Sequence, residues 1–303
     1  MVAPLPAELL KSITQGQLVV FAGSGASAPT GRPTWQSLME NLVEIASKEG
    51  LPVVTSEGLR ELMRLSKDIA HVKLVPQIIW SSLRRVFGHN GEGIYFECVR
   101  QALANEQAAP ASSYHRLLLD LHPYCVLTTN YDPCFETASG ERGGDWKEMI
   151  LRELSPEWES DGLLKDVIYH IHGSQTDGKE RTMVLSLKDY GDLYRKDPQA
   201  SLFLRQAFST SNVLFFGASM NDEEILAEFY ENMGEGPHWA LVPKNSKEAA
   251  LFRAMGVHAV DYEFEAASKT NKWRANHFGA EQVLSHWATS ANSVLKQVKK
   301  GVA

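Results

Sequence analysis

The chain has 303 residues, of which 44% are hydrophobic, 9% are aromatic and 22% are charged, and its formal net charge is −7. A chain of this length and composition can bury a large core and is typical of a globular protein. The acidic balance argues against a large nucleic-acid-binding face, which needs a basic surface. No apolar run approaches the ~20 residues of a membrane span and no signal peptide begins the chain, so we expect a cytoplasmic protein that binds no membrane.

The three cysteines, Cys98, Cys125 and Cys134, are widely spaced. They form no pair of the kind found in zinc sites or in disulfide frameworks. We therefore expect neither a bound metal nor a disulfide.

Short apolar segments alternate with segments of helical spacing along the chain. Strands are predicted over Leu18–Ala22, Cys125–Thr129, Val167–Ile171, Met183–Leu187, Val213–Phe216, Trp239–Val242 and Val257–Tyr262. Helices are predicted over 9–15, 36–48, 113–121, 200–210, 222–233, 246–255 and 280–298. Several strands are almost continuously apolar, as in a parallel sheet that helices cover on both faces. This pattern predicts an α/β fold with a Rossmann-like, doubly wound, mostly parallel sheet.

The interval between the first two predicted strands departs from this alternation. It contains amphipathic segments such as Ile78–Val86 and Ile94–Ala104, and only a weak extended candidate at Leu51–Val54. We interpret residues about 50–110 as a helical lobe inserted into a single domain that spans the whole chain and ends in a helix at about 280–298.

A glycine-rich loop follows the first predicted strand. Gly23-x-Gly25-x-x-Ala28 meets the loose dinucleotide-binding fingerprint, in which glycines admit a ligand close to the backbone and amides hold a pyrophosphate. The usual acidic residue about 20 positions later is missing, because Glu40 and Glu44 lie in a helical pattern. No Lys-Ser or Lys-Thr follows the glycines, which excludes a P-loop. A plain tight turn is the alternative.

Polar residues appear abruptly after three further predicted strands. TTNYD contains Asn130 and Asp132, HIHGS contains His170 and His172, and FFGASMND ends with Asp222. Each has a plainer explanation: the two aspartates could cap helices, and His170 is expected to be an interior histidine. All four motifs nevertheless lie at carboxyl ends of predicted parallel strands, where ligands bind in open α/β sheets. Together they predict a nucleotide site with one titratable group.

The order AGSGAS, GRPTW, TTNYD, HIHGS and FFGASMND resembles the sirtuin family over residues 17 to 262. It is more similar to the sirtuin-like NAD hydrolases of bacterial antiphage defence. This resemblance implies that NAD is bound by Ala22, Gly23, Ser24, Ala26, Thr34, Trp35, Gly217, Ser219 and Asn221. It implies that Asn130, Asp132 and His172 face the reactive carbon.

The sequence also departs from the sirtuin deacylases. Those enzymes carry two cysteine pairs that bind zinc in this part of the chain, whereas no cysteine lies between His172 and Gly217. Because the zinc lobe helps to wall the acyl-lysine channel, the departure disfavours a protein deacylase.

The chemistry of NAD cleavage suits these residues. Nicotinamide leaves NAD as a neutral molecule, so the general acid of ordinary glycosidases is not required. A histidine with a pKa near ~6.5 can accept a proton at neutral pH. We therefore assign His172 as the general base, Asn130 to the positioning of water and ribose, and Asp132 to support.

These assignments predict an NAD+ glycohydrolase that forms nicotinamide and ADP-ribose, or cyclic ADP-ribose, and that acts in antiphage defence by NAD depletion. The alternatives are a zinc-free deacylase or ADP-ribosyltransferase, and a nucleotide-sensing module without turnover.

Unrestrained NAD loss would kill the host, so the resemblance implies control by a homo-oligomer or by a regulatory defence partner. The helical lobe carries more apolar residues than one narrow core-facing stripe needs: Ile78, Ile79, Trp80, Leu83, Val86 and Phe87. Such a set suits an interface. The alternative is that the lobe packs onto the sheet and covers the ribose pocket.

Overall fold

The computed structural model of the chain describes residues 2–65, 72–105, 107–154, 162–176, 178–220, 222–234, 236–264 and 277–301. Seven strands form one sheet in the order β3-β4-β2-β1-β5-β6-β7, and every neighbouring pair is parallel. The strands are β1 Leu18–Ala22, β2 Cys125–Thr128, β3 Lys147–Ile150, β4 Val167–His170, β5 Asn212–Phe216, β6 Trp239–Pro243 and β7 His258–Tyr262. The predicted α/β class with a parallel, doubly wound sheet is confirmed.

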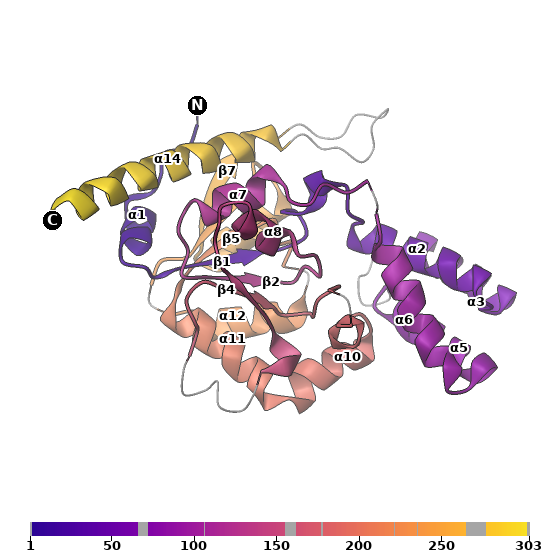
Figure 1. The fold of residues 1–303 in the computed structure, drawn as a ribbon. Helices are drawn as coiled ribbons and strands as arrows, with labels where there is room; N and C mark the ends of the chain where they lie inside the picture. Colours follow the sequence, from indigo (N-terminus) through magenta and orange to yellow (C-terminus); the bar gives the residue numbers. More distant parts are fainter. Residues whose placement is uncertain are drawn as a thin grey trace.

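Helices cover both faces of this sheet and build a separate lobe (Figure 1). Those of the sheet domain are α1 Ala7–Thr14, α7 Ser113–Leu119, α8 Cys134–Gly140, α10 Leu187–Gly191, α11 Pro198–Thr210, α12 Glu223–Asn232, α13 Lys247–Ala254 and α14 Phe278–Gly301. Those of the lobe are α2 Trp35–Lys48, α3 Val53–Leu65, α5 Leu74–Phe87 and α6 Asn90–Leu103. Among the described residues, no helix combines the length and apolar character needed to cross a membrane.

Successive residues of each central strand enter different cores. In β1, Val19 and Phe21 pack with α11, α12 and α13, whereas Leu18 and Val20 pack with α1, α7 and α14. A strand buried on both faces has no polar alternation, which explains its continuous apolar sequence. Aromatic contacts fill the first core, where the rings of Phe21 and Phe215 lie 5.3 Å apart between centroids.

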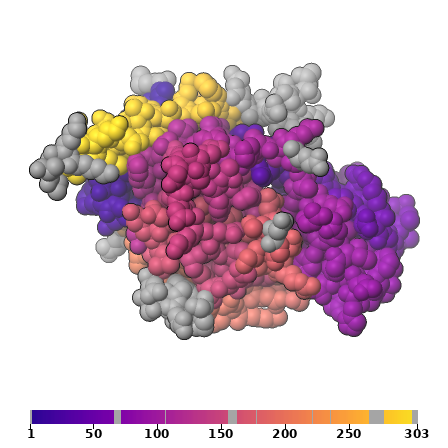
Figure 2. Space-filling view, viewed as in Figure 1, coloured from indigo at the N-terminus to yellow at the C-terminus, as the bar shows by residue number. Residues whose placement is uncertain are grey.

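The helical lobe has a core of its own. Leu38 and Val43 of α2, Ile79 and Leu83 of α5, and Val99 of α6 are all buried in it. In the space-filling view the indigo and purple lobe forms a bulk beside the sheet domain (Figure 2). Val86 and Phe87 at the end of α5 are 50% and 39% exposed.

The strand predicted over Met183–Leu187 is wrong. Val184 is buried and its amide donates to the carbonyl of His172, but the segment pairs with no strand of the sheet. Helix α10 begins instead at Leu187, because Ser186 and Asp189 form a reciprocal capping box. The spacing Ser-x-x-Asp was the signal in the sequence.

Two smaller predictions also fail at the edges of the fold. Leu51–Val54 is not extended throughout, because α3 begins at Val53. The edge strand β3, Lys147–Ile150, was not predicted, because two of its four residues are charged and only Ile150 is buried. An edge strand needs little apolar sequence, so its pairing with β4 leaves a weak signal.

Candidate functional site

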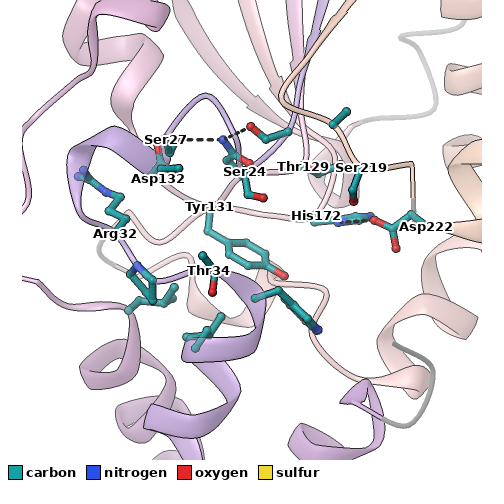
Figure 3. Close-up of a pocket in the computed structure, with 18 of the residues that line it drawn as sticks. Ser24, Ser27, Arg32, Thr34, Thr129, Tyr131, Asp132, His172, Ser219 and Asp222 are labelled. Atoms are coloured by element: carbon teal, nitrogen blue, oxygen red, sulfur yellow. Dashed lines mark hydrogen bonds and ion pairs between the residues drawn. The ribbon is translucent and has the colours of Figure 1, made fainter. Parts of the chain in front are cut away.

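The carboxyl ends of β1, β2, β4 and β5 meet beside the lobe around a cavity of about 160 Å³ (Figure 3). Asn130, Asp132 and His172 all line it. A larger cavity of about 1220 Å³ adjoins it. The two cavities share six of their lining residues: Ala28, Arg32, Pro33, Thr34, Ala218 and Ser219. The site is therefore bipartite, with a small part and a large part that share the residues of two loops.

The glycines after β1 serve loop packing. A Cβ atom on Gly23 would lie 2.6 Å from the Cα atom of Ala218, and one on Gly25 would lie 2.6 Å from that of Gly217. Gly217 itself has φ +64°, which favours glycine. The Gly23 and Gly25 amides donate to the carbonyls of Phe216 and Gly217. These glycines bring two loops together, and the close approach of a ligand to their backbone stays a prediction.

The other residues implied for NAD binding divide into two groups. Gly23, Ser24, Thr34, Trp35, Gly217 and Ser219 line one or both cavities. Ala22 and Ala26 are fully buried in the core and line neither cavity, and their contact with NAD stays a prediction. Asn221 lies outside the described residues.

Thr34 and Trp35 form the start of the lobe at the cavity wall. Thr34 caps α2, because its hydroxyl accepts from the Ser37 amide at 3.3 Å. The buried Trp35 Nε1 atom has no hydrogen-bond partner among the described residues. The cap fixes where the helix begins, and hence where the indole meets the cavity.

Asn130 is held by hydrogen bonds to neutral groups. Its Nδ2 donates to the Gly23 carbonyl at 3.1 Å and to the Ser27 hydroxyl at 3.0 Å (Figure 3). Its backbone amide donates to the Thr128 hydroxyl at 3.1 Å. Because both Nδ2 hydrogens are used, the carbonyl Oδ1 is the part of the amide left to accept from a ligand.

His115 fixes the Ser27 hydroxyl. A backbone N–H can only donate, and the Ser112 amide lies 3.1 Å from Nδ1 of His115, so Nδ1 accepts and the proton sits on Nε2. Nε2 then donates to Ser27 Oγ over 3.3 Å. Burial lowers the pKa of His115 to about 4, so the ring stays neutral at neutral pH. The chain from His115 through Ser27 to Asn130 therefore fixes the orientation of the amide.

Asp132 is 8% exposed and lines the same cavity. One carboxylate oxygen accepts from the Cys134 amide at 3.2 Å, at the start of α8. The plainer alternative for this residue, a backbone-capping role, thus has a contact that supports it.

His172 follows β4 and is 2% exposed. Its Nε2 lies 2.8 Å from the Tyr194 hydroxyl, and its Nδ1 lies 3.8 Å from Oδ2 of Asp222. Since a carboxylate can only accept, this arrangement favours a proton on Nδ1 and a Tyr194 hydroxyl that donates to Nε2. Burial lowers the pKa of His172, with Asp222 opposing the shift and Lys73 adding to it.

Asp222 does not cap α12, although it occupies the N-cap position. Its Oδ1 lies 3.0 Å from Nζ of Lys73, a residue of the lobe. Burial alone would raise the pKa of Asp222, but His172 and Lys73 hold it below its ordinary value. The reading of Asp222 as a cap is corrected: its side chain belongs to the charged part of the site.

Gly173, which follows His172, packs closely against the loop that returns to the strand end. A Cβ atom there would lie 2.5 Å from the Thr182 carbonyl oxygen, and φ is +89°. The glycine allows the following loop to fold back against the strand end.

His170 is fully buried, and the prediction of an interior histidine is confirmed. Its Nδ1 lies 2.8 Å from the Asn130 carbonyl and its Nε2 lies 2.8 Å from Glu136. Burial opposes a charge on the ring, but Glu136 raises the pKa of His170 above its usual value. Its neighbours Glu136 and Glu148 bring three potential metal ligands together, yet both ring nitrogens already have protein partners.

Several residues that complete the site were not among the residues predicted from sequence. Lys73, Arg32, Ser27, Tyr131 and Tyr190 line the small cavity, and His115 and Tyr194 stand behind it. Tyr194 lies in a π-helical segment, η4 Asp192–Lys196, and such segments often occur at functional sites, but its pattern cannot be read from sequence.

Known proteins with similar sequences belong to the group that the order of motifs indicated. The profile of the SIR2-like domain family matches residues 124–260. The chain is 26% identical over 220 residues to "Defense-associated sirtuin 2" of Bacillus subtilis, and 24% identical over 236 residues to "NAD(+) hydrolase ThsA" of Cytobacillus dafuensis. These matches cover 72% and 75% of this chain but only 19% and 41% of the relatives.

A solved structure described as a SIR2 homologue–NAD complex matches 97% of this chain and 96% of its own, with 13% identity and a TM-score of 0.43. The family profile and the two curated relatives confirm the predicted resemblance to the sirtuin-like defence proteins.

Proposed function

We propose that this sirtuin-like chain cleaves the nicotinamide–ribose bond of NAD+ and so depletes NAD in antiphage defence. The observation that carries the proposal is the meeting of Asn130 and His172 in one cavity at the carboxyl edge of the sheet. The relative named as an NAD(+) hydrolase supports the same reaction. The products are nicotinamide and ADP-ribose, or cyclic ADP-ribose if a group of the same molecule attacks instead of water.

The bipartite site suits a dinucleotide. The small cavity would take nicotinamide and its ribose, and the larger one, lined by Phe216, Tyr262 and Gly217, would take adenosine. Arg32 lines both cavities, so its guanidinium is available where the pyrophosphate would cross. We assign the phosphate charge to Arg32 because the amides of the glycine loop are largely used within the protein.

Two groups of the protein perform the chemistry in this proposal. The fixed Oδ1 of Asn130 accepts a hydrogen bond from the attacking water or from a ribose hydroxyl. The attacking group replaces the Tyr194 hydroxyl at Nε2 of His172 and gives its proton to that nitrogen. The lowered pKa of His172 keeps Nε2 unprotonated at neutral pH. Nicotinamide leaves as a neutral molecule, so Asp132 is needed only to support the site.

The deacylase and ADP-ribosyltransferase alternatives require a second, protein substrate. In the segment between His172 and Gly217, where deacylases carry zinc, the described residues include the helical segments α10, η4 and α11. Phe203 and Phe208 of α11 pack into the core of the sheet. A sensor without turnover would have no use for a buried neutral base, so we favour cleavage.

Release of nicotinamide from NAD+ alone tests the proposal. We expect His172→Ala and Asn130→Ala each to lower the rate by about two to four orders of magnitude, because loss of a positioned base or acceptor has that effect. His286→Ala on the exposed side of α14 is the matched control and should keep the wild-type rate. Wild-type turnover in either site variant, with an unchanged circular dichroism spectrum, would refute the assignment.

Control of this activity by a homo-oligomer is a further part of the proposal. Val86 and Phe87 are exposed at the tip of α5, whereas Ile79 and Leu83 are buried inside the lobe. The surface available for a neighbouring subunit is therefore smaller than the apolar sequence predicts. We expect light scattering over a concentration series to report a mass above that of one chain, and Val86→Lys to lower it. A strict monomer at tens of micromolar would leave control to a separate partner.

A further inference from the structure

Lys73 is a lobe residue buried in the small cavity. It precedes α5, is 5% exposed and lines the cavity with His172. Its Nζ lies 3.0 Å from Oδ1 of Asp222, 3.6 Å from Oε2 of Glu224 and 3.6 Å from the ring centre of Tyr190. Lysine side chains are rarely buried this deeply, and a buried ammonium group needs partners of this kind.

Asp222 stands between two positively chargeable groups. One oxygen contacts Lys73, and the other lies 3.8 Å from Nδ1 of His172 (Figure 3). A movement of Lys73 therefore changes how far the negative charge of Asp222 is neutralised, and so changes the electrostatic effect of Asp222 on His172.

We propose that Lys73 is a positioning residue, which shares the Asp222 carboxylate with His172 and thereby lets the position of the helical lobe set the strength of His172 as a base. The inference rests on the proposed function of His172 as the general base of NAD+ cleavage. The proposal gives the lobe a part in the chemistry, since the ammonium group of Lys73 is one of the charges in the small cavity.

The charges around His172 come from several elements. Asp222 and Glu224 on α12 favour its protonated form, whereas Lys73 from the lobe and Arg152 from η2 Leu151–Glu153 disfavour it. Tyr194 contributes its hydroxyl at Nε2. With Lys73 in place the pKa of His172 lies below its usual value, and burial is the largest cause. Withdrawal of Lys73 leaves two carboxylates facing the ring, so the pKa rises.

Besides the ammonium group, polar contacts and the buried side chains of Met183 and Leu185 connect the lobe to the sheet domain. The Lys73 carbonyl accepts from the Leu187 amide, at the start of α10, over 3.2 Å. Arg181 of η3 Glu180–Thr182 pairs with Glu92 of α6 and stacks over Phe96. Loosening the second contact is therefore a way to disturb the lobe without touching the cavity.

The pH dependence of kcat tests the proposal. The base must be unprotonated, so activity falls as the pH drops through the pKa of His172, and each pH unit by which this acid limb moves changes the rate below it about tenfold. We expect Lys73→Met to move the limb to higher pH and Asp222→Asn to move it to lower pH. Lys73→Arg, which keeps the charge, should stay near the wild-type limb.

The contribution of the lobe needs a variant outside the cavity. Arg181→Ala should move the acid limb in the same direction as Lys73→Met, but less. The matched control is Arg64→Gln, because the Arg64 partner Glu61 lies on the same helix, α3. An unmoved limb in Arg181→Ala would overturn the role of the lobe position, and an unmoved limb in Lys73→Met would overturn the role of the charge.

Direct titration separates this inference from the proposed reaction. The NMR signal of the His172 ring reports its pKa in wild type, Lys73→Met and Asp222→Asn whether or not NAD+ is cleaved. Absence of nicotinamide release from wild type, with opposite pKa shifts in the two variants, would reject only the proposed function. Equal pKa values in all three proteins would reject the charge sharing. If Lys73→Met does not fold, Asp222→Asn and Glu224→Gln must both lower the pKa for the inference to stand.

Discussion

Asn130 and His172 face one cavity, but their surroundings differ in kind. Neutral groups of the sheet domain hold Asn130: the Gly23 carbonyl and the Ser27 hydroxyl, with His115 behind them. Charged groups surround His172, and one of them, Lys73, comes from the lobe. A neutral, fully bonded amide keeps its geometry over a wide pH range, whereas a histidine among charges responds to each of them. We infer that the first half of the cavity fixes geometry and the second half controls protonation.

The two cations of the small cavity sharpen this contrast. Lys73 is buried among carboxylates, whereas Arg32 is partly exposed and donates to the Ala109 carbonyl at 2.8 Å. We expect Arg32→Gln to raise KM about 10- to 100-fold with little change in kcat, because a charged hydrogen bond to phosphate is worth about 1.5–3 kcal/mol. Steady-state kinetics of nicotinamide release measure both constants.

Arg32→Lys serves as the control for that measurement, since it retains the charge but not the two-pronged geometry, and its KM should rise less. An unchanged KM in Arg32→Gln would place the pyrophosphate away from this residue. A shifted acid limb would show that Arg32 acts on His172, and the contrast between the two cations would fail.

A smaller effect is expected in the neutral half. His115→Phe keeps a ring against Phe135, whose ring centre lies 4.7 Å away, but removes the donor to Ser27. The Asn130 amide then loses part of its restraint, worth about 1 kcal/mol or roughly fivefold in kcat. The position of the acid limb should not move, because the neutral His115 is no part of the charged group.

Ser112→Ala gives the matched control for His115→Phe. It removes the hydroxyl bond to the Ala26 carbonyl near α7 but leaves the Ser27 contact of Asn130 in place. We expect a lower melting temperature with a nearly normal kcat. Equal losses of kcat in both variants would contradict the role of His115 in orienting Asn130 and would leave it only a role in local stability.

Two of the site residues predicted from sequence, Asn130 and His172, follow buried strands, whereas Thr34 and Trp35 lie at the start of α2. Asn130 and His172 come directly after apolar runs, and parallel strands place their carboxyl ends at one edge. The glycines after β1 were equally visible, but their purpose was not. Only the packing of Gly25 against Gly217 reveals that they serve contact between loops.

The amino-acid sequence alone determined the parallel α/β sheet, the place of the site on it, and the resemblance to sirtuin-like proteins, because strand burial and strand-end motifs are local patterns. The tertiary structure decided which charges act on the base. Lys73 and Asp222 are 149 residues apart, and neither lies in a pattern that marks it for the other. Pairs of this kind form only when the lobe folds against the sheet, since an ion pair depends on distance in space and leaves no periodic trace along the chain.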